Sequence, residues 1–259
     1  MVAPATLRAA AWYATRRSVV LGMLTSSLIA VDAAPFAQRL AGWLPDLLGG
    51  GLRRVTLLHA IEGDTAGVAA ELDELRPTLD RLALTLSSQA VETDIALKRG
   101  DVVKWMQALA ELRHIDLVVV GPPRTTDMAL STVGRLLDAS SVAVLVLGRE
   151  RDPDGMPLFD RPLLLADAAD DALLELAARA LVPAPVTPTK LAPQGCCPAD
   201  ASLLVTGPAP AGRHVMDLIK GSICPVLVFP AQALHATPRP GPSTTILPST
   251  LPGAVQGAS

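Results

Sequence analysis

Residues 116–121 read Asp116-Leu117-Val118-Val119-Val120-Gly121, an apolar run between an acidic residue and a glycine. A short run with no polar side chain on either face is typical of a buried strand. Apolar periodicity predicts a helix before it, over Val102–Arg113, and a shorter helix after it, over Val133–Ser140. Residues 122–132, which start with two prolines and are rich in threonine, are expected to form a loop. The strand therefore lies between helices, as in a parallel sheet.

The same alternation extends towards the N-terminus, where a short helical lead-in over residues 1–17 is expected. Because right-handed crossovers must cover both faces of a parallel sheet, the order predicts a doubly wound α/β domain over residues 18–149. Its remaining elements are expected to be strands at Ser18–Leu24, Arg54–Ile61, Val91–Leu97 and Val142–Leu147, a turn at 25–27, and helices at Leu28–Leu48 and Ala66–Ser87.

After a polar linker at residues 150–160, the order partly restarts. This predicts a second, shortened domain of the same kind over residues 161–230. Residues 231–259 are rich in Pro, Ser, Thr and Gly and are expected to form a disordered tail. The second domain is expected to contain strands at Leu163–Ala166, Leu203–Thr206 and Pro225–Phe229, helices at Asp170–Leu181 and His214–Lys220, and an unpatterned stretch at Pro183–Pro198.

Composition excludes several classes of function. The formal net charge is −3 and only 3% of residues are aromatic, which gives no attraction to nucleic acid or to anionic membranes. The three cysteines form no CxxC pair, and the four histidines have no metal-ligand spacing, so neither a disulfide nor a metal is expected. No apolar run is long enough for a membrane span. We therefore expect a cytoplasmic protein.

One alternative concerns export. Arg16-Arg17-Ser18, followed by an apolar run to Val31 and then Asp32-Ala33, has the outline of a twin-arginine signal. Cleavage after Ala33 would delete the expected first strand, and the run is interrupted by the polar residues 25–27. N-terminal sequencing of the mature chain distinguishes the two hypotheses.

Several segments together resemble the universal stress protein family. They are Val19-Val20-Leu21 with Ser26, then Val55–Ile61, Gly100-Asp101 and Asp116–Gly121, in the family's order and spacing. The segments Ala143–Leu147 and Cys224–Phe229 each resemble the strand that closes a domain of this family. The resemblance implies two tandem Rossmann-like (HUP-type) domains. Family members dimerise through these closing strands, and in a tandem chain we predict that they meet within one molecule, with pairing between chains as the alternative.

The resemblance also implies where nucleotide would bind. Nucleotide-binding members hold ATP with an Asp at the end of strand one and a loop Gly-x2-Gly-x9-Gly-Ser/Thr after strand four, whose glycines let backbone N–H groups approach the phosphates. In this chain we place Leu24 at the Asp position and Arg124 at the second glycine. The final step falls at Gly134-Arg135 or, counted from the closing strand, at Leu130-Ser131.

In the second domain, Asp167 and Gly207 keep the pattern, but Pro210 stands at the second glycine. The resemblance thus implies two vestigial nucleotide sites. The residues expected in them are Ser26, Ile61, Gly121, Arg124, Ser131, Gly134, Asp167 and Gly207.

These observations favour a non-catalytic protein of stress response or regulation, which acts through a protein partner or through self-association and has weakened or lost nucleotide binding. No cofactor is expected beyond weak ATP or AMP. The alternatives are an ATP- or AMP-binding sensor of the same fold and an exported protein. Cys224 with His214 is the only nucleophile and base close together in one domain, and we interpret Cys224 as a core residue.

Overall fold

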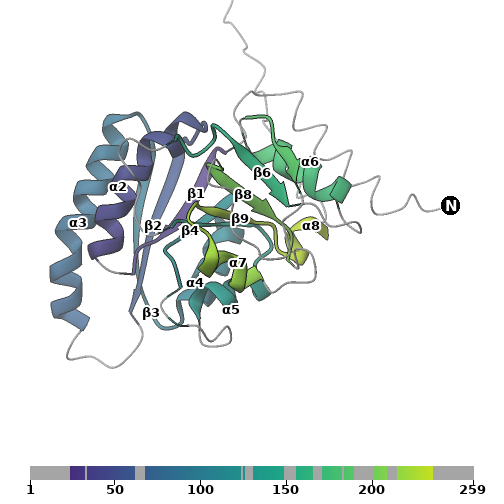
Figure 1. Ribbon diagram of the computed structural model, residues 1–259. Coiled ribbons are helices and arrows are strands. Elements are labelled where there is room, and N and C mark those ends of the chain that lie inside the picture. Colours follow the sequence, from purple (N-terminus) through teal and green to yellow (C-terminus); the bar gives the residue numbers. More distant parts are fainter. Residues whose placement is uncertain are drawn as a thin grey trace, which may run out of the picture.

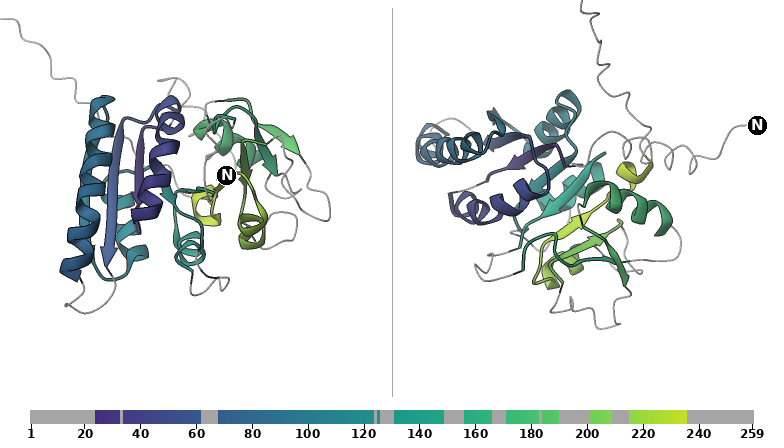
Figure 2. Two further views of the ribbon diagram at one scale, coloured as in Figure 1. Left: turned by 60° about the vertical axis from the view of Figure 1, so that its left-hand side comes forward. Right: turned by 90° about the horizontal axis from the view of Figure 1, so that it is seen from above.

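The structure, a computed structural model, describes residues 24–32, 34–61, 68–123, 125, 131–148, 156–165, 171–182, 184–189, 201–208 and 215–235. These residues build one nine-stranded sheet with the strand order β3-β2-β1-β4-β5-β9-β8-β6-β7 (Figure 1). We call β1 to β5 and their helices the first half, and β6 to β9 and their helices the second half. The halves lie side by side along the sheet (Figure 2).

All neighbouring strands of the first half are parallel, with the order β3-β2-β1-β4-β5. Helices α2 and α3 cover one face of the sheet, and α4 and α5 cover the other. The strands are β1 (Ser26–Ala30), β2 (Arg54–Ile61), β3 (Glu92–Arg99), β4 (Leu117–Val120) and β5 (Ala143–Val146). The helices are α2 (Ala34–Gly49), α3 (Val68–Ser88), α4 (Val102–Leu112) and α5 (Thr132–Ala139).

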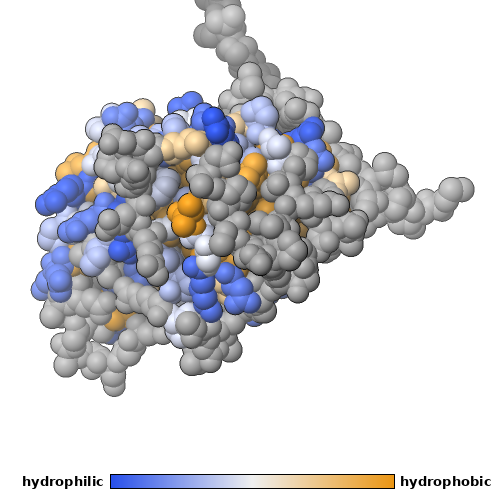
Figure 3. All heavy atoms as spheres, in the orientation of Figure 1, coloured by the Kyte–Doolittle hydropathy of each residue, from blue (hydrophilic) through white to orange (hydrophobic). Residues whose placement is uncertain are grey.

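Strand β1 shows why the central strands are apolar throughout. Ile29 and Val31 pack with α2 and α3, whereas Leu28 and Ala30 pack with α4 and α5. Successive side chains of a strand point to opposite faces, so a strand covered by helices on both sides needs apolar residues at every position. Most of the exposed residues described in α3 are polar, with Leu84 as an exception, and many hydrophilic side chains lie on that side of the molecule, at the left of Figure 3.

The second half repeats the first in shortened form. Its strand order, β9-β8-β6-β7, reproduces the order β5-β4-β1-β2 of the first half without a counterpart of β3. Its strands are parallel to one another. The elements are β6 (Pro162–Leu165), α6 (Asp171–Leu181), β7 (Thr187–Thr189), β8 (Leu203–Thr206), α7 (Val215–Gly221), β9 (Val226–Val228) and a short helix α8 (Ala231–His235).

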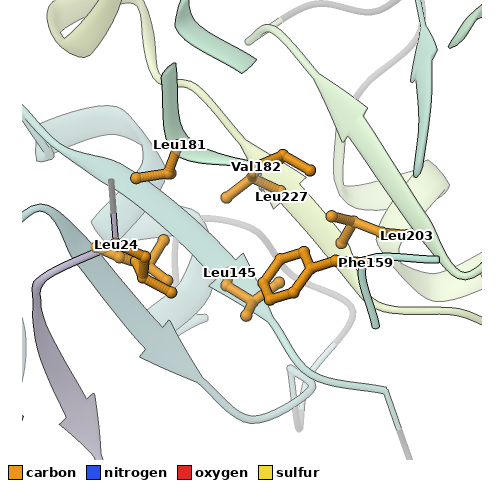
Figure 4. A pocket seen from close by; sticks show the side chains of 8 residues that line it. Leu24, Leu145, Phe159, Leu181, Val182, Leu203 and Leu227 are labelled. Carbon is orange, nitrogen blue, oxygen red and sulfur yellow. The ribbon is translucent and has the colours of Figure 1, made fainter. Parts of the chain in front are cut away.

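The two halves join where β5 and β9 pair antiparallel, with Leu145 opposite Leu227. This confirms the prediction that the two closing strands meet within one chain. Around the junction, side chains from both halves enclose a narrow apolar void of about 10 Å³, which Figure 4 shows from close by. A void of that volume is about the size of one water molecule, so it holds no organic ligand. Both hydrophobic clusters continue across the junction.

The expected first strand, Ser18–Leu24, is wrong. Strand β1 starts at Ser26, and Leu24 lies before it as a buried core residue, while residues 18–23 lie outside the described part of the chain. The expected turn at residues 25–27 is also wrong, because Ser26 and Ser27 belong to β1 and are buried. Their small side chains fit inside the sheet, and the Ser26 backbone N–H donates to Asp116 Oδ2 at 3.1 Å.

Helix α2 consequently starts at Ala34 instead of Leu28, because residues 28–31 are strand and the end of strand. Strand β7 lies in the stretch that showed no pattern, and α8 lies within the expected disordered tail. The expected linker is also partly core, since Leu158 is buried. The other elements start and end within about two residues of their predicted bounds.

The domain limits at 18–149 and 161–230 stay predictions. The lead-in at residues 1–17, most of the linker and residues 236–259 lie outside the described residues. Among the described helices, none combines the length and the hydropathy that a bilayer span requires.

Candidate functional site

A cavity of about 360 Å³ opens at the carboxyl ends of β1 and β4. After β1 the chain turns to α2 on one face of the sheet, and after β4 it leads to α5 on the other face. Such a reversal leaves a crevice beyond the strand ends, which is where ligands bind in open α/β sheets. The volume is within the range of small-molecule sites.

One wall of the cavity is apolar. It is formed by strand ends and by residues near the N-termini of α4 and α5. Its residues are Ala30, Val31, Ala60, Val102, Met106, Val120 and Val133, with Gly121, Pro122 and Pro123 following β4. Such a wall suits an uncharged apolar group, because that group gains from leaving water without losing hydrogen bonds.

The polar groups of the cavity are Asp32, which follows β1, and the hydroxyl residues Thr125, Ser131 and Thr132. Asp32 stands two residues after the end of β1, at the place where we expected Leu24. The conclusion from the sequence that the acidic residue is replaced by Leu24 is therefore wrong. It followed from placing the first strand too early in the chain.

The N-terminus of α5 contributes further polar groups to the cavity. Ser131 is its N-cap residue, and its Oγ accepts a hydrogen bond from the Gly134 backbone N–H at 3.3 Å. Ser131 and Thr132 both line the cavity. Helical N–H groups point towards the N-terminus and carry a partial positive charge, so this end of α5 offers donors to an oxyanion.

Gly121 has a packing reason to be glycine. A Cβ atom on this residue would lie 2.9 Å from Cδ2 of Phe36, a buried residue of α2. That separation is shorter than packed carbon atoms tolerate. The glycine after β4 is thus explained by the close approach of α2, whether or not a phosphate binds nearby.

An ion pair joins α4 to α5 beside the cavity. Asp101 is the N-cap residue of α4, and its Oδ1 accepts from the backbone N–H groups of Val103 at 2.9 Å and Lys104 at 3.4 Å. Its Oδ2 accepts from Arg135 of α5. Burial raises the pKa of Asp101, but the hydrogen bonds from Val103, Arg135 and Lys104 outweigh it, so the pKa lies below its ordinary value.

The structure brings some of the expected site residues to the cavity. Gly121 and Ser131 line it. Gly134 lies inside α5, where its N–H donates to Ser131, and Ile61 ends β2 next to the lining residue Ala60.

Other expected site residues lie elsewhere. Ser26 is at the amino end of β1, so the cavity and Ser26 occupy opposite ends of the strand. Gly207 follows β8 in the second half, and a Cβ atom there would be 3.8 Å from Leu174, an ordinary contact. Arg124 and Asp167 lie outside the described residues.

Sequence reasoning missed Asp32, Thr125 and Thr132. A signal for Asp32 was present, because Leu28–Val31 is an apolar run closed by an acidic residue, much as Leu117–Val120 is closed by glycine. Both runs end at the same edge of the parallel sheet.

No protein-family model matches this sequence, and no curated protein matches it. Among solved structures, a universal stress protein from Archaeoglobus fulgidus DSM 4304 matches with a TM-score of 0.60 at 17% identity, covering 81% of this chain and 97% of the other. A functionally unknown protein from Pseudomonas aeruginosa PAO1 matches with a TM-score of 0.56 at 13% identity, covering 83% and 96%.

The cytoplasmic domain of a prokaryotic cation chloride cotransporter matches with a TM-score of 0.52 at 15% identity, covering 79% of this chain and 94% of that domain. Likeness at such low identity establishes the fold. The chain therefore has the α/β, Rossmann-like fold of universal stress protein structures, which confirms the predicted fold class.

Proposed function

We propose that this chain is a universal stress protein that binds an adenine nucleoside or nucleotide in the first-half cavity and acts in regulation through protein contacts, without chemical turnover. One observation carries the proposal. A cavity of about 360 Å³ at the strand-order reversal between β1 and β4 has a carboxylate, Asp32, and the N-terminus of α5 among its lining groups.

Each part of the cavity has a chemical counterpart in such a ligand. The Asp32 carboxylate accepts hydrogen bonds only, which suits a pair of ribose hydroxyls. The apolar wall suits a purine ring, and the first turn of α5 suits a phosphate. The fit rests on the residue types of the lining and on their placement on three different elements.

The sequence alone favoured weakened or lost nucleotide binding. One half of that reasoning was the missing acidic residue at the end of the first strand. This half no longer holds, because the first strand had been misplaced and Asp32 follows β1. The other half remains, because Pro122 and Pro123 follow Gly121 and the next glycine along the chain is Gly134, inside α5. We therefore propose that binding is retained but differs in its phosphate contacts from that of family members with the glycine loop.

The role that we propose is regulatory and involves no turnover. The described lining residues offer the Asp32 carboxylate and three hydroxyl groups, and no Cys, His or Lys is among them. The likeness to the cytoplasmic domain of a cotransporter is an analogy at the level of fold, and it shows that this fold also serves as part of a larger membrane protein.

Calorimetric titration with adenosine, AMP and ATP tests the proposal. We expect binding by the unaltered chain and about tenfold or greater weakening in Asp32→Asn, since a hydrogen bond to a charged group contributes about 1.5–3 kcal/mol. Asp80→Asn, on the exposed side of α3, is the matched control and should bind as the unaltered chain does. The proposal fails if none of the three ligands binds at millimolar concentration, or if the two variants bind equally well.

A further inference from the structure

The described lining of the cavity offers little positive charge to a ligand. Among its described lining residues, Asp32 is the one that carries a charge, and it is negative. A helix N-terminus contributes the equivalent of about half a positive charge. ATP carries about four negative charges at neutral pH, so the described lining opposes a triphosphate much more than it opposes an uncharged nucleoside.

Among the described residues, Arg135 is a basic side chain placed to change this balance. It lies in α5, four residues after the N-cap residue Ser131. The Cα–Cβ bonds of a helix tilt towards its N-terminus, so an extended guanidinium at this position reaches the end of α5 that faces the cavity. Guanidinium groups bind phosphate through paired hydrogen bonds.

Arg135 is instead bound to Asp101. The side chains are 36% and 27% exposed, so the pair is partly shielded from water. The other oxygen of the same carboxylate caps α4, which fixes Asp101 in place. The pKa of Asp101 is below its ordinary value, which favours the ionised carboxylate that Arg135 binds.

From this arrangement we propose that the cavity selects nucleosides over nucleoside triphosphates, and that Asp101 sets this preference by holding Arg135 away from the phosphate position. The inference rests on the proposed function and specifies the charge of the ligand that the cavity prefers. Asp101 acts here as a positioning residue, because its effect on the ligand passes through Arg135.

Asp101→Asn is the variant that tests the proposal. Asn caps a helix about as well as Asp does, so α4 keeps its N-cap while the negative charge is removed. Arg135 then becomes available to phosphate. We expect ATP to bind at least tenfold more tightly than to the unaltered chain, with adenosine affinity unchanged, because a charge-assisted hydrogen bond has about that effect.

The control pair lies at the other end of α4, where Arg113 binds Asp94 with an N–O distance of 2.6 Å. Asp94→Asn removes a carboxylate from an arginine in the same way but away from the cavity. It should leave the ratio of adenosine to ATP affinity unchanged. The double variant Asp101→Asn with Arg135→Gln should return the ratio to that of the unaltered chain.

The measurement is calorimetry with adenosine, AMP and ATP in the presence of EDTA. The unaltered chain should bind adenosine at least tenfold more tightly than ATP, and Arg135→Gln alone should not alter that ratio. The proposal is overturned if ATP binds as tightly as adenosine, if Arg135→Gln alone weakens ATP, or if Asp101→Asn tightens both ligands equally. If none of the ligands binds, the proposed function itself fails, and with it this inference.

Discussion

A charge placed at the junction of the two halves tests whether β5 and β9 form the interior of one sheet. Leu227 of β9 is 3% exposed, lies opposite Leu145 of β5 and borders the small apolar void in Figure 4. Leu227→Asp removes a buried aliphatic side chain, which alone costs about 2–5 kcal/mol in unfolding free energy. It also buries a carboxylate without a partner, which adds several kcal/mol.

Together these losses are comparable with the whole stability of an ordinary domain, about 5–15 kcal/mol. Leu227→Asp should therefore be largely unfolded or aggregated at 25 °C, as judged by urea denaturation followed by circular dichroism and by size-exclusion chromatography. Leu84→Asp is the matched control, because Leu84 is 71% exposed on α3. It should change the unfolding free energy by less than about 0.5 kcal/mol. Equal stability and solubility of the two variants would refute the buried junction.

Two further predictions concern residues beside the cavity. Gly121→Ala should destabilise the chain by about 1–3 kcal/mol, because the new methyl group overlaps Phe36. In urea titrations, the loss of unfolding free energy should be smaller in a Phe36→Leu background. An equal loss in both backgrounds would show that Phe36 is not the cause. The pKa of Asp101 is lowered in the folded chain, so its ionised form adds stability above about pH 4, the ordinary range of an Asp carboxyl. This added stability is lost as the pH falls through the lowered pKa of the folded chain. The difference in unfolding free energy between the unaltered chain and Asp101→Asn should therefore shrink below pH 4, and a difference that grows on acidification would contradict the assignment.

Much of the fold was predictable because the apolar runs of the central strands fit no other secondary structure as well. Leu203–Thr206 was predicted to the residue, and the strand expected over residues 115–120 is Leu117–Val120, since a short β-branched and leucine-rich run between helical patterns fits little else. The meeting of the closing strands was predicted from the family resemblance, because local periodicity carries no information about which edges meet. Their antiparallel orientation was not predicted.

The errors arose where local patterns pointed elsewhere. Residues 19–24 are more uniformly apolar than Ser26–Ala30, so the strand was placed too early, and small buried serines were interpreted as a turn. Pro188 argued against a strand, although proline is tolerated on an edge strand such as β7. Nothing in the sequence indicated the pairing of Asp101 with Arg135, which depends on how α4 packs beside α5.

The position of β1 is the point on which the proposed site depends. A crystal structure of the full chain grown with millimolar adenosine tests it most directly. We predict β1 at Ser26–Ala30 and the ribose of adenosine beside the Asp32 carboxylate, between the ends of β1 and β4. A first strand built from residues 18–24, or adenosine bound anywhere other than this cavity, would contradict the account.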